Sequence, residues 1–148
     1  MALTVRRLQI VDLPTLERTE AERDQRFKRP GALATFRKLV EETLSAEPEG
    51  LMVADLDGRV AGLAIARQRG NHPSSGRPHG RVEYLAVTPG FETLGITARL
   101  VREAEAYLRS RGCTALHVLL PADDTGDAGL FKSTGYQVVA WELEKLLG

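Results

Sequence analysis

The spacing of hydrophobic residues along the chain alternates between two periods, and the changes predict where helices and strands lie. Apolar residues three and four positions apart, separated by charged residues, are typical of amphipathic helices. The clearest stripe consists of Leu33, Phe36, Leu39, Val40 and Leu44. From this spacing and from capping residues we expect helices at residues 14–27, 32–46, 95–111 and 125–134.

Shorter apolar runs predict six strands, at residues 4–10, 51–56, 60–67, 81–87, 115–120 and 136–143. Asp57-Gly58, between the second and third of these runs, is a strong tight-turn signal and predicts an antiparallel hairpin. Residues 68–80 contain so much glycine, proline, serine and asparagine that we expect a loop. The order of these elements predicts an α+β fold in a single domain, residues 1–148.

Composition and charge exclude several classes of partner. Hydrophobic residues make up 43% of the 148 positions, enough for a sizeable core without disulfides or metal. Lys plus Arg equals Asp plus Glu at 20 each, so we expect neither nucleic acid nor a membrane as partner. Cys113 is the only cysteine, which excludes an intramolecular disulfide and fits a reducing cytoplasm. No apolar stretch approaches the roughly 18 residues of a membrane span.

The stretch YLAVTPGFETLGITARL, residues 84–100, joins a strand to a helix through a proline and a glycine. It resembles the central motif of the GCN5-related N-acetyltransferases (GNAT), in which an apolar strand ends in V-x-P and a Gln/Arg-x-x-Gly-x-Gly/Ala sequence opens the next helix. The matching positions are Val87, Pro89, Gly95, Ile96 and Leu100. Glu92 stands where the family usually has Gln or Arg, and Thr97 stands where it has Gly or Ala.

A second stretch, DDTGDAGLFKSTGY at residues 123–136, resembles the family's carboxy-terminal pattern of Asn, an apolar-aromatic pair and Gly-Phe. Asp124 falls at the Asn position, Leu130-Phe131 at the pair and Gly135-Tyr136 at Gly-Phe. Phe131 stands where many members carry a tyrosine. The resemblance covers nearly the whole chain. It implies a GNAT-like mixed, mostly antiparallel central sheet flanked by helices, with acetyl-CoA as co-substrate.

The same resemblance implies that the coenzyme binds where this strand meets this helix. A helix N-terminus leaves its first amides unpaired and carries about half a positive charge, so backbone donors can hold a pyrophosphate. The implied cofactor-binding residues are Leu85, Ala86 and Val87 on the strand edge, Glu92, Thr93, Leu94, Gly95, Ile96 and Thr97 at the helix start, and Asp124 and Phe131. Glu92 repels the phosphates unless its side chain points to solvent. The side chain of Thr97 either clashes with a phosphate or hydrogen-bonds it.

Acetyl transfer to an amine requires a base for the ammonium proton and a donor for the oxyanion. The resemblance implies Glu83, on the active-site strand, as the base; the other interpretation is a carboxylate on the wet face of a strand. The backbone amide of Val87 is the expected oxyanion donor. Because Phe131 cannot donate a proton, the departing thiolate takes its proton from water or from Tyr84, unless Tyr84 is a core aromatic.

Two functions fit these residues. The first is an N-acetyltransferase that moves an acetyl group from acetyl-CoA to a primary amine of a small molecule or protein by direct attack, with His72 and His79 either near the acceptor or merely solvated. The second, motivated by the three departures from the family pattern, is a catalytically degenerate module of the same fold that acts in coenzyme A sensing or protein interaction. The carboxy-terminal strand with Trp141 predicts a homodimer, and a core role for Trp141 is the alternative.

Overall fold

The computed structural model describes residues 2–27, 31–120 and 125–148, and its centre is a five-stranded sheet. The strands, in their order across the sheet, are β1 (Leu3–Arg7), β2 (Leu51–Leu56), β3 (Arg59–Asn71), β4 (Pro78–Val87) and β5 (Ala115–Val118). The pairs β1–β2, β2–β3 and β3–β4 are antiparallel, and β5 runs parallel to β4. The helices are α1 (Leu13–Phe27), α2 (Ala32–Ala46), α3 (Ile96–Ser110) and α4 (Thr125–Ser133).

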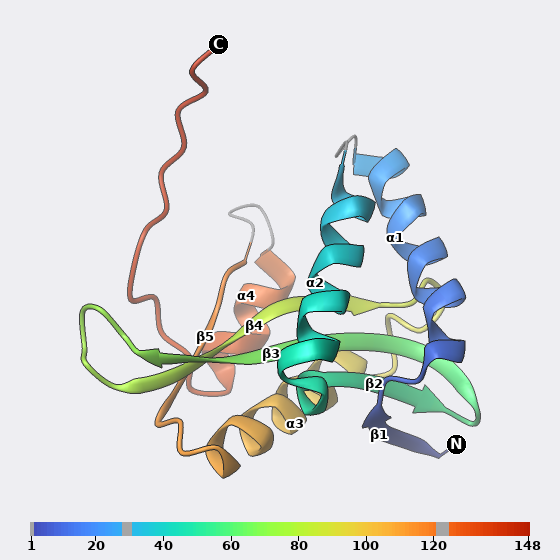
Figure 1. The fold of residues 1–148 in the computed structure, drawn as a ribbon, viewed down its shortest axis with the longest axis horizontal. Coiled ribbons are helices and arrows are strands. Elements are labelled where there is room, and N and C mark those ends of the chain that lie inside the picture. Colours follow the sequence, from blue (N-terminus) through green and yellow to red (C-terminus); the bar gives the residue numbers. More distant parts are fainter. Residues whose placement is uncertain (1, 28–30, 121–124) are drawn as a thin grey trace.

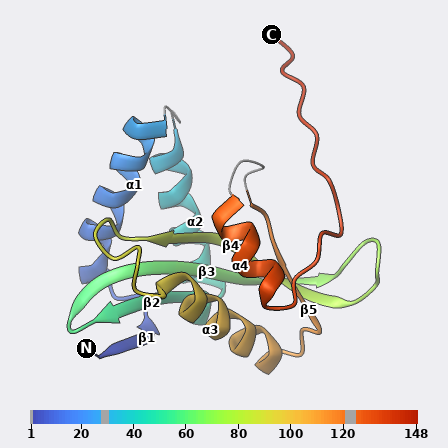
Figure 2. The ribbon, with the colours of Figure 1, turned by 180° about the vertical axis from the view of Figure 1, so that it is seen from behind.

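Helices cover both faces of this sheet: α1 and α2 lie on one face, and α3 and α4 lie on the other (Figures 1 and 2). Short 3₁₀ turns at Ile10–Asp12 and Pro48–Gly50 lead into α1 and β2. The predicted α+β class, with a mostly antiparallel sheet flanked by helices, is therefore confirmed.

Two hydrophobic clusters fill the two sides of the sheet, because successive residues of a strand point to opposite faces. In β2, Val53 packs beneath α1 and α2 while Met52 and Ala54 pack beneath α3. The α1/α2-side cluster consists of Leu16, Phe36, Val40, Leu51, Val53, Leu63 and Ile65. The α3-side cluster consists of Met52, Ala54, Leu56, Ala61, Ala64, Ala66, Val82, Ile96, Leu100, Ala104 and Leu108.

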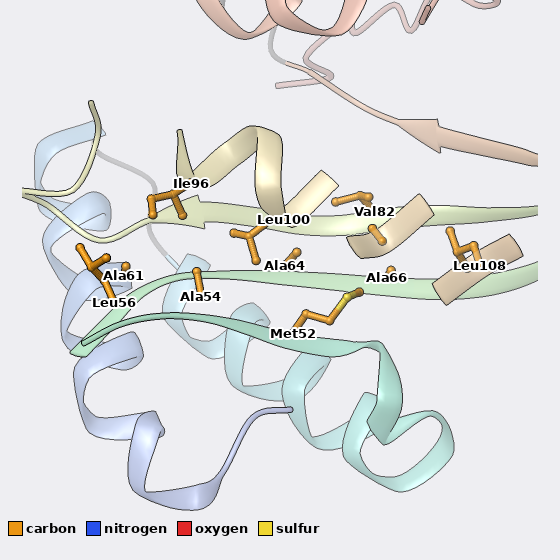
Figure 3. Packing of buried hydrophobic residues seen from close by; sticks show 11 residues of the cluster. Met52, Ala54, Leu56, Ala61, Ala64, Ala66, Val82, Ile96, Leu100 and Leu108 are labelled. Atoms are coloured by element: carbon orange, nitrogen blue, oxygen red, sulfur yellow. The ribbon is translucent and has the colours of Figure 1, made fainter. Parts of the chain in front are cut away.

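Small residues on the α3 side let that helix lie close to the sheet. Figure 3 shows Ile96, Leu100 and Leu108 of α3 packed with the alanines of β2 and β3. The first turn of α3 comes close at Gly62, where a Cβ would lie 3.0 Å from Ile96 Cγ2 and 2.8 Å from the carbonyl oxygen of Ala86. Since Ile96 is the first residue of α3 and only 1% exposed, this packing fixes where the helix begins.

The hairpin formed by β3 and β4 is longer than the sequence predicts. The loop predicted at residues 68–80 is wrong at both ends, because β3 continues to Asn71 and β4 begins at Pro78. Residues 72–77 alone connect the two strands. The ladder shifts register beside Gly70, whose φ of 71° is in the left-handed region. A glycine that favours a turn in sequence thus accommodates an irregularity within a strand.

The strand predicted at residues 136–143 is wrong. Residues 136–148, here called the C-terminal tail, contain neither helix nor strand. Figures 1 and 2 show the tail running away from the sheet after α4. An alternating apolar pattern forms a strand only where a neighbouring strand accepts and donates its backbone hydrogen bonds, and no described strand of this chain lies beside the tail.

Candidate functional site

In the described part of the chain, no strand pairs with the second half of β4 on the side that faces β5. Pairing between β4 and β5 starts at His79 opposite Ala115 and ends at Val82 opposite Val118, where β5 itself ends. From there β4 continues through residues 83–87, paired only with β3 among the described strands. We call the unpaired side of residues 83–87 the open edge of β4.

The open edge presents the backbone groups of Leu85 and Val87. The N–H of Thr88 donates to the carbonyl of Ala61 at 2.9 Å, which orients Thr88 toward β3. Because the backbone groups of successive strand residues point to opposite sides, the N–H and C=O of Val87 and Leu85 point away from β3. Those of Ala86, a third residue expected at the coenzyme, point toward β3. The edge therefore offers an extended chain a short ladder of donors and acceptors.

Helix α3 begins directly after the loop that follows this edge. Gly95 precedes the helix with φ of 70°, a left-handed conformation that glycine adopts without strain. The amides of Gly95, Ile96 and Thr97 donate to no described residue, as expected for the first turn of a helix. The amide of Leu94 instead donates to the carbonyl of Phe91 at 3.3 Å, so its predicted role as an anion donor requires that bond to open.

Glu92 lies in this loop, and its side chain is exposed to solvent. Its Oε2 accepts a hydrogen bond of 2.8 Å from the backbone N–H of Gly90. The carboxylate is therefore held on the loop's own backbone. The neighbouring Thr93 is also exposed, and Thr97 is half-buried in the first turn of α3.

Glu83, the expected base, lies at an irregularity of β4. Tyr84 pairs with Ile65 and Val82 with Ala66, which leaves Glu83 as the extra residue of a bulge. Its Oε1 accepts a hydrogen bond of 2.6 Å from Nε of Arg69 and forms an ion pair with the same guanidinium. Glu83 is thus neither buried in the core nor a free carboxylate on a solvent-exposed strand face, because Arg69 on the neighbouring strand holds its carboxylate.

The bulge at Glu83 also turns Tyr84 to the opposite face of the sheet. Val82 packs in the α3-side cluster, whereas Tyr84 packs against the α1/α2-side cluster with its ring centroid 5.0 Å from that of Phe36. Without the extra residue the two side chains would share one face. Tyr84 is therefore a packed aromatic, as one of its two interpretations expects, and its role as proton donor to the thiolate stays a prediction.

The hydroxyl of Tyr84 donates to Oε2 of Glu20 at 2.5 Å. Glu20 lies on α1 and is only 3% exposed. No motif in the sequence marks this carboxylate. The available signal was its place four residues after Leu16, on the apolar stripe of the first helix, where a charged residue needs a partner.

The two cofactor-binding residues predicted in the carboxy-terminal part of the chain are Phe131 and Asp124. Phe131, on α4, is 3% exposed and packs edge-on against Tyr136 with ring centroids 4.9 Å apart. The phenyl ring supplies no proton, as expected from its type. Asp124, the remaining expected cofactor residue, lies outside the described residues.

The three histidines of the chain gather at the far end of the β3–β4 hairpin. Ring centroids of His72, His79 and His117 are 4.5 to 5.1 Å apart, and His79 Nδ1 lies 2.9 Å from the carbonyl of Gly70. Burial, and then the other two histidines, lower the pKa of His117. Eight residues of strand at about 3.3 Å each separate His79 from Val87, about 26 Å in all, which places the cluster away from the open edge.

Two features are absent from the described residues. The described residues contain no group of three or more His, Cys, Asp and Glu side chains arranged to hold a metal ion. Likewise, none of the helices in the described part of the chain combines the length and apolar character required to cross a bilayer.

Known proteins resemble this chain in sequence and in fold. An acetyltransferase of Pectobacterium atrosepticum is 27% identical over 100 residues, which cover 68% of this chain and 66% of that protein, just under two thirds of its length. The structure of a ribosomal-protein-alanine N-acetyltransferase from Brucella melitensis superposes with a TM-score of 0.74 at 18% identity, covering 99% of this chain and 100% of that one. An aminoglycoside N-acetyltransferase solved in complex with CoA superposes with a TM-score of 0.75 at 19% identity, covering 98% and 94% of the two chains.

At these identities the two structural likenesses establish the fold alone. The family model described as Acetyltransferase (GNAT) family matches residues 8–136, from the residue after β1 to just beyond α4. Since that match covers four of the five described strands and all four described helices, the chain belongs to the acetyltransferase (GNAT) family.

Proposed function

We propose that this protein transfers an acetyl group from acetyl-CoA to the primary amine of a small molecule or protein. One observation carries the proposal: the open edge of β4 leads, through one loop, to the unpaired amides at the start of α3. The two features offer a ladder for an amide-containing arm and an anion site for a pyrophosphate. The related fold solved in complex with CoA supports the same choice of co-substrate.

In this proposal the pantetheine arm pairs with the backbone of Leu85 and Val87, and the pyrophosphate lies at the amides of Gly95, Ile96 and Thr97. A Cβ at Gly95 would meet no atom within 4 Å, so there is open space on its surface for a ligand. The helix dipole adds a favourable field for the anion. Binding here depends mainly on backbone groups, which the departures at Glu92 and Thr97 do not remove.

The chemistry is a single displacement. The amine nitrogen bonds to the acetyl carbon, the carbon–sulfur bond breaks, and the nitrogen releases its second proton to solvent as it becomes an amide. Coenzyme A leaves as a thiolate that takes a proton from solvent. The Val87 amide stabilises the oxyanion. Glu83 accepts the ammonium proton through a water molecule while Arg69 keeps its carboxylate in place. Tyr84 is a weaker choice as acid, because its hydroxyl already donates to Glu20.

The alternative function, a catalytically degenerate module that senses coenzyme A or binds a protein, is favoured by one observation. The carboxylate of Glu92 occupies the amide of Gly90, beside the proposed phosphate site. Calorimetric titration with acetyl-CoA, followed by an acetyl-transfer assay on a panel of amines, separates the two functions. Saturable binding with transfer supports the enzyme, binding without transfer supports the sensing module, and no binding at millimolar ligand contradicts both uses of coenzyme A.

Proline at position 87 tests the mechanism itself. Because the N–H of Val87 points away from β3, Val87→Pro deletes the proposed oxyanion donor without deleting a ladder hydrogen bond. We expect kcat to fall by about 10²–10³-fold. Val87→Ala is the matched control, since it keeps the amide and should keep kcat within a few fold. Circular dichroism verifies that both variants fold, and an unchanged kcat in a folded Val87→Pro protein would remove the amide from the mechanism.

A further inference from the structure

Three histidines join the end of the β3–β4 hairpin to the edge strand of the sheet. Residues 72–77, here called the hairpin tip, connect β3 to β4, and Figures 1 and 2 show that they extend past the ends of the helices. His72 begins the tip, His79 lies on β4 and His117 lies on β5. The contact of His72 with His117 therefore links the tip to β5.

The three rings pack against one another. Those of His72 and His117 are stacked, with centroids 4.5 Å apart and planes inclined by 12°. His79 meets both rings edge-on at 5.0 and 5.1 Å and is only 5% exposed. Neutral imidazoles can pack in this way, whereas two imidazolium rings at this separation repel each other. The packing therefore favours neutral rings.

Hydrogen bonds assign the protonation of two of the rings. His72 Nδ1 accepts from the backbone N–H of Ser74 at 3.1 Å and from that of Ser75 at 3.4 Å. A ring nitrogen accepts only when it has no proton, so His72 is neutral and carries its proton on Nε2. His79 Nδ1 lies 2.9 Å from the carbonyl oxygen of Gly70, which only accepts, so this nitrogen carries a proton. A further proton leaves the bond of His79 intact and breaks those of His72.

His72 also holds the tip through its backbone. Its N–H donates to the carbonyl of Arg77, and its carbonyl accepts from the N–H of Gly76, both at 2.8 Å. These backbone bonds do not depend on the protonation of the ring, whereas the bonds to Nδ1 from Ser74 and Ser75 do. The state of one ring therefore decides whether the middle of the tip is held.

The strands around the cluster offer no free carboxylate to balance additional positive charge. Apart from the histidines, the charged residues at 68–83 and 115–118 are Arg69, Arg77, Arg81 and Glu83. The carboxylate of Glu83 is engaged by Arg69. Burial, then the other two histidines and then Arg81 lower the pKa of His117. Protons added to the cluster therefore meet positive charge on these strands.

We propose that His72, His79 and His117 form a proton-sensitive latch for the hairpin tip. While the rings are neutral, the stacking of His72 on His117 and the bonds to His72 Nδ1 hold the tip against β5. As the cluster takes up protons between about pH 8 and pH 5, where histidines titrate, Nδ1 ceases to accept and like charges separate the rings. The tip then leaves β5, while the pairing of β4 with β5, in which His72 takes no part, remains.

Nuclear magnetic resonance of the isotope-labelled protein measures ring protonation and tip order in the same sample. At about pH 8 we expect the proton of His72 on Nε2, that of His79 on Nδ1, and a nuclear Overhauser contact between the rings of His72 and His117. On acidification to about pH 5 the contact should vanish as His72 becomes protonated. Protection of the Ser74 amide from exchange should fall by about 3–10-fold, the equivalent of one hydrogen bond.

Two variants at His72 separate the hydrogen-bond acceptor from the charge. An asparagine side chain accepts from the backbone two residues on and takes up no proton, so His72→Asn should protect the Ser74 amide equally at both pH values. His72→Phe keeps a flat ring without the acceptor and should leave that amide unprotected at both. The amide spectra of the other residues verify that each variant folds.

Three results overturn the proposal. The first is a wild-type protein in which protection of the Ser74 amide does not change with pH. The second is a pH dependence of that protection that persists in His72→Asn, which would assign it to other groups. The third is a His72 ring that carries its proton on Nδ1 at about pH 8, because that nitrogen could then accept no bond from the tip.

Discussion

Gly62 is the point at which β3, β4 and the first turn of α3 come closest together. A Cβ there would lie 2.8 Å from the carbonyl oxygen of Ala86 and 3.0 Å from Cγ2 of Ile96. The carbonyl belongs to the backbone of β4 and cannot rotate away. Gly62→Ala must therefore widen the β3–β4 pairing or lift the start of α3 from the sheet. We expect it to lower both stability and affinity for acetyl-CoA.

The expected size of the effect follows from two opposing contributions. Overpacking a core costs about 1–3 kcal/mol. Alanine restricts the unfolded chain more than glycine does, which returns about 0.4–1 kcal/mol. Taking the middle of each range, the unfolding free energy of Gly62→Ala should therefore fall by about 1.3 kcal/mol. Gly129→Ala in α4 is the matched control, because a Cβ at Gly129 meets no atom within 4 Å, and it should be neutral or stabilising by up to about 1 kcal/mol.

Urea-induced unfolding followed by circular dichroism measures the stability of the two variants, and calorimetry measures their affinity for acetyl-CoA. An unfolding free energy of Gly62→Ala equal to that of the wild type would refute the argument that close packing fixes the start of α3. A loss of stability with unchanged affinity would show that the amides of the first turn do not depend on this contact.

Three further predictions concern charge. Glu92→Gln removes a carboxylate from the loop before the proposed phosphate site. Two unit charges about 6 Å apart in water repel by under about 1 kcal/mol, so the calorimetric affinity for acetyl-CoA should rise by up to about fivefold; an unchanged affinity would mean that the side chain does not face the ligand. Glu83→Gln should lower kcat by about 10²–10⁴-fold with little change in acetyl-CoA affinity. Arg69→Gln, which removes the cation that holds the Glu83 carboxylate, is the comparison variant. Turnover unaffected by Glu83→Gln would exclude that carboxylate as the base. The lowered pKa of His117 means that the unfolded chain binds its proton more tightly, so stability should fall as pH drops through about 6.5 and below; unfolding free energies measured between pH 5 and 8 should vary less with pH in His117→Gln, and an equal slope would assign the dependence to other groups.

Local signals were sufficient for most of the elements. The helix predicted at residues 32–46 has those bounds, and the one predicted at 95–111 is α3, Ile96–Ser110. At the predicted turn, Asp57 and Gly58 have φ of 52° and 85°, the pair of positive values that a tight hairpin turn requires. Each of these features depends on residues that are neighbours in sequence, so a short window contains the information.

For the same reason, only part of the candidate site could be predicted from the sequence. The strand that ends at Val87 and the helix that begins after Gly95 were predictable, because both belong to one continuous motif. The partners of the side chains were not. Arg69 reaches Glu83 across the hairpin, and Glu20 reaches Tyr84 from 64 positions away in the sequence. A local pattern can mark Glu20 as a carboxylate that needs a partner, but it identifies neither of these partners.

The sequence by itself therefore determined the family, the order of the elements and the place of the strand-to-helix junction, because periodicity, turn residues and a contiguous motif encode them. Tertiary structure alone decided which face each side chain of β4 occupies, how far the β3–β4 hairpin extends and whether the tail finds a strand to join. The bulge at Glu83 shows the physical reason: one unpaired residue reverses the alternation of every side chain beyond it. Its position is set by pairing with β3, which is a property of the assembled sheet and not of the strand.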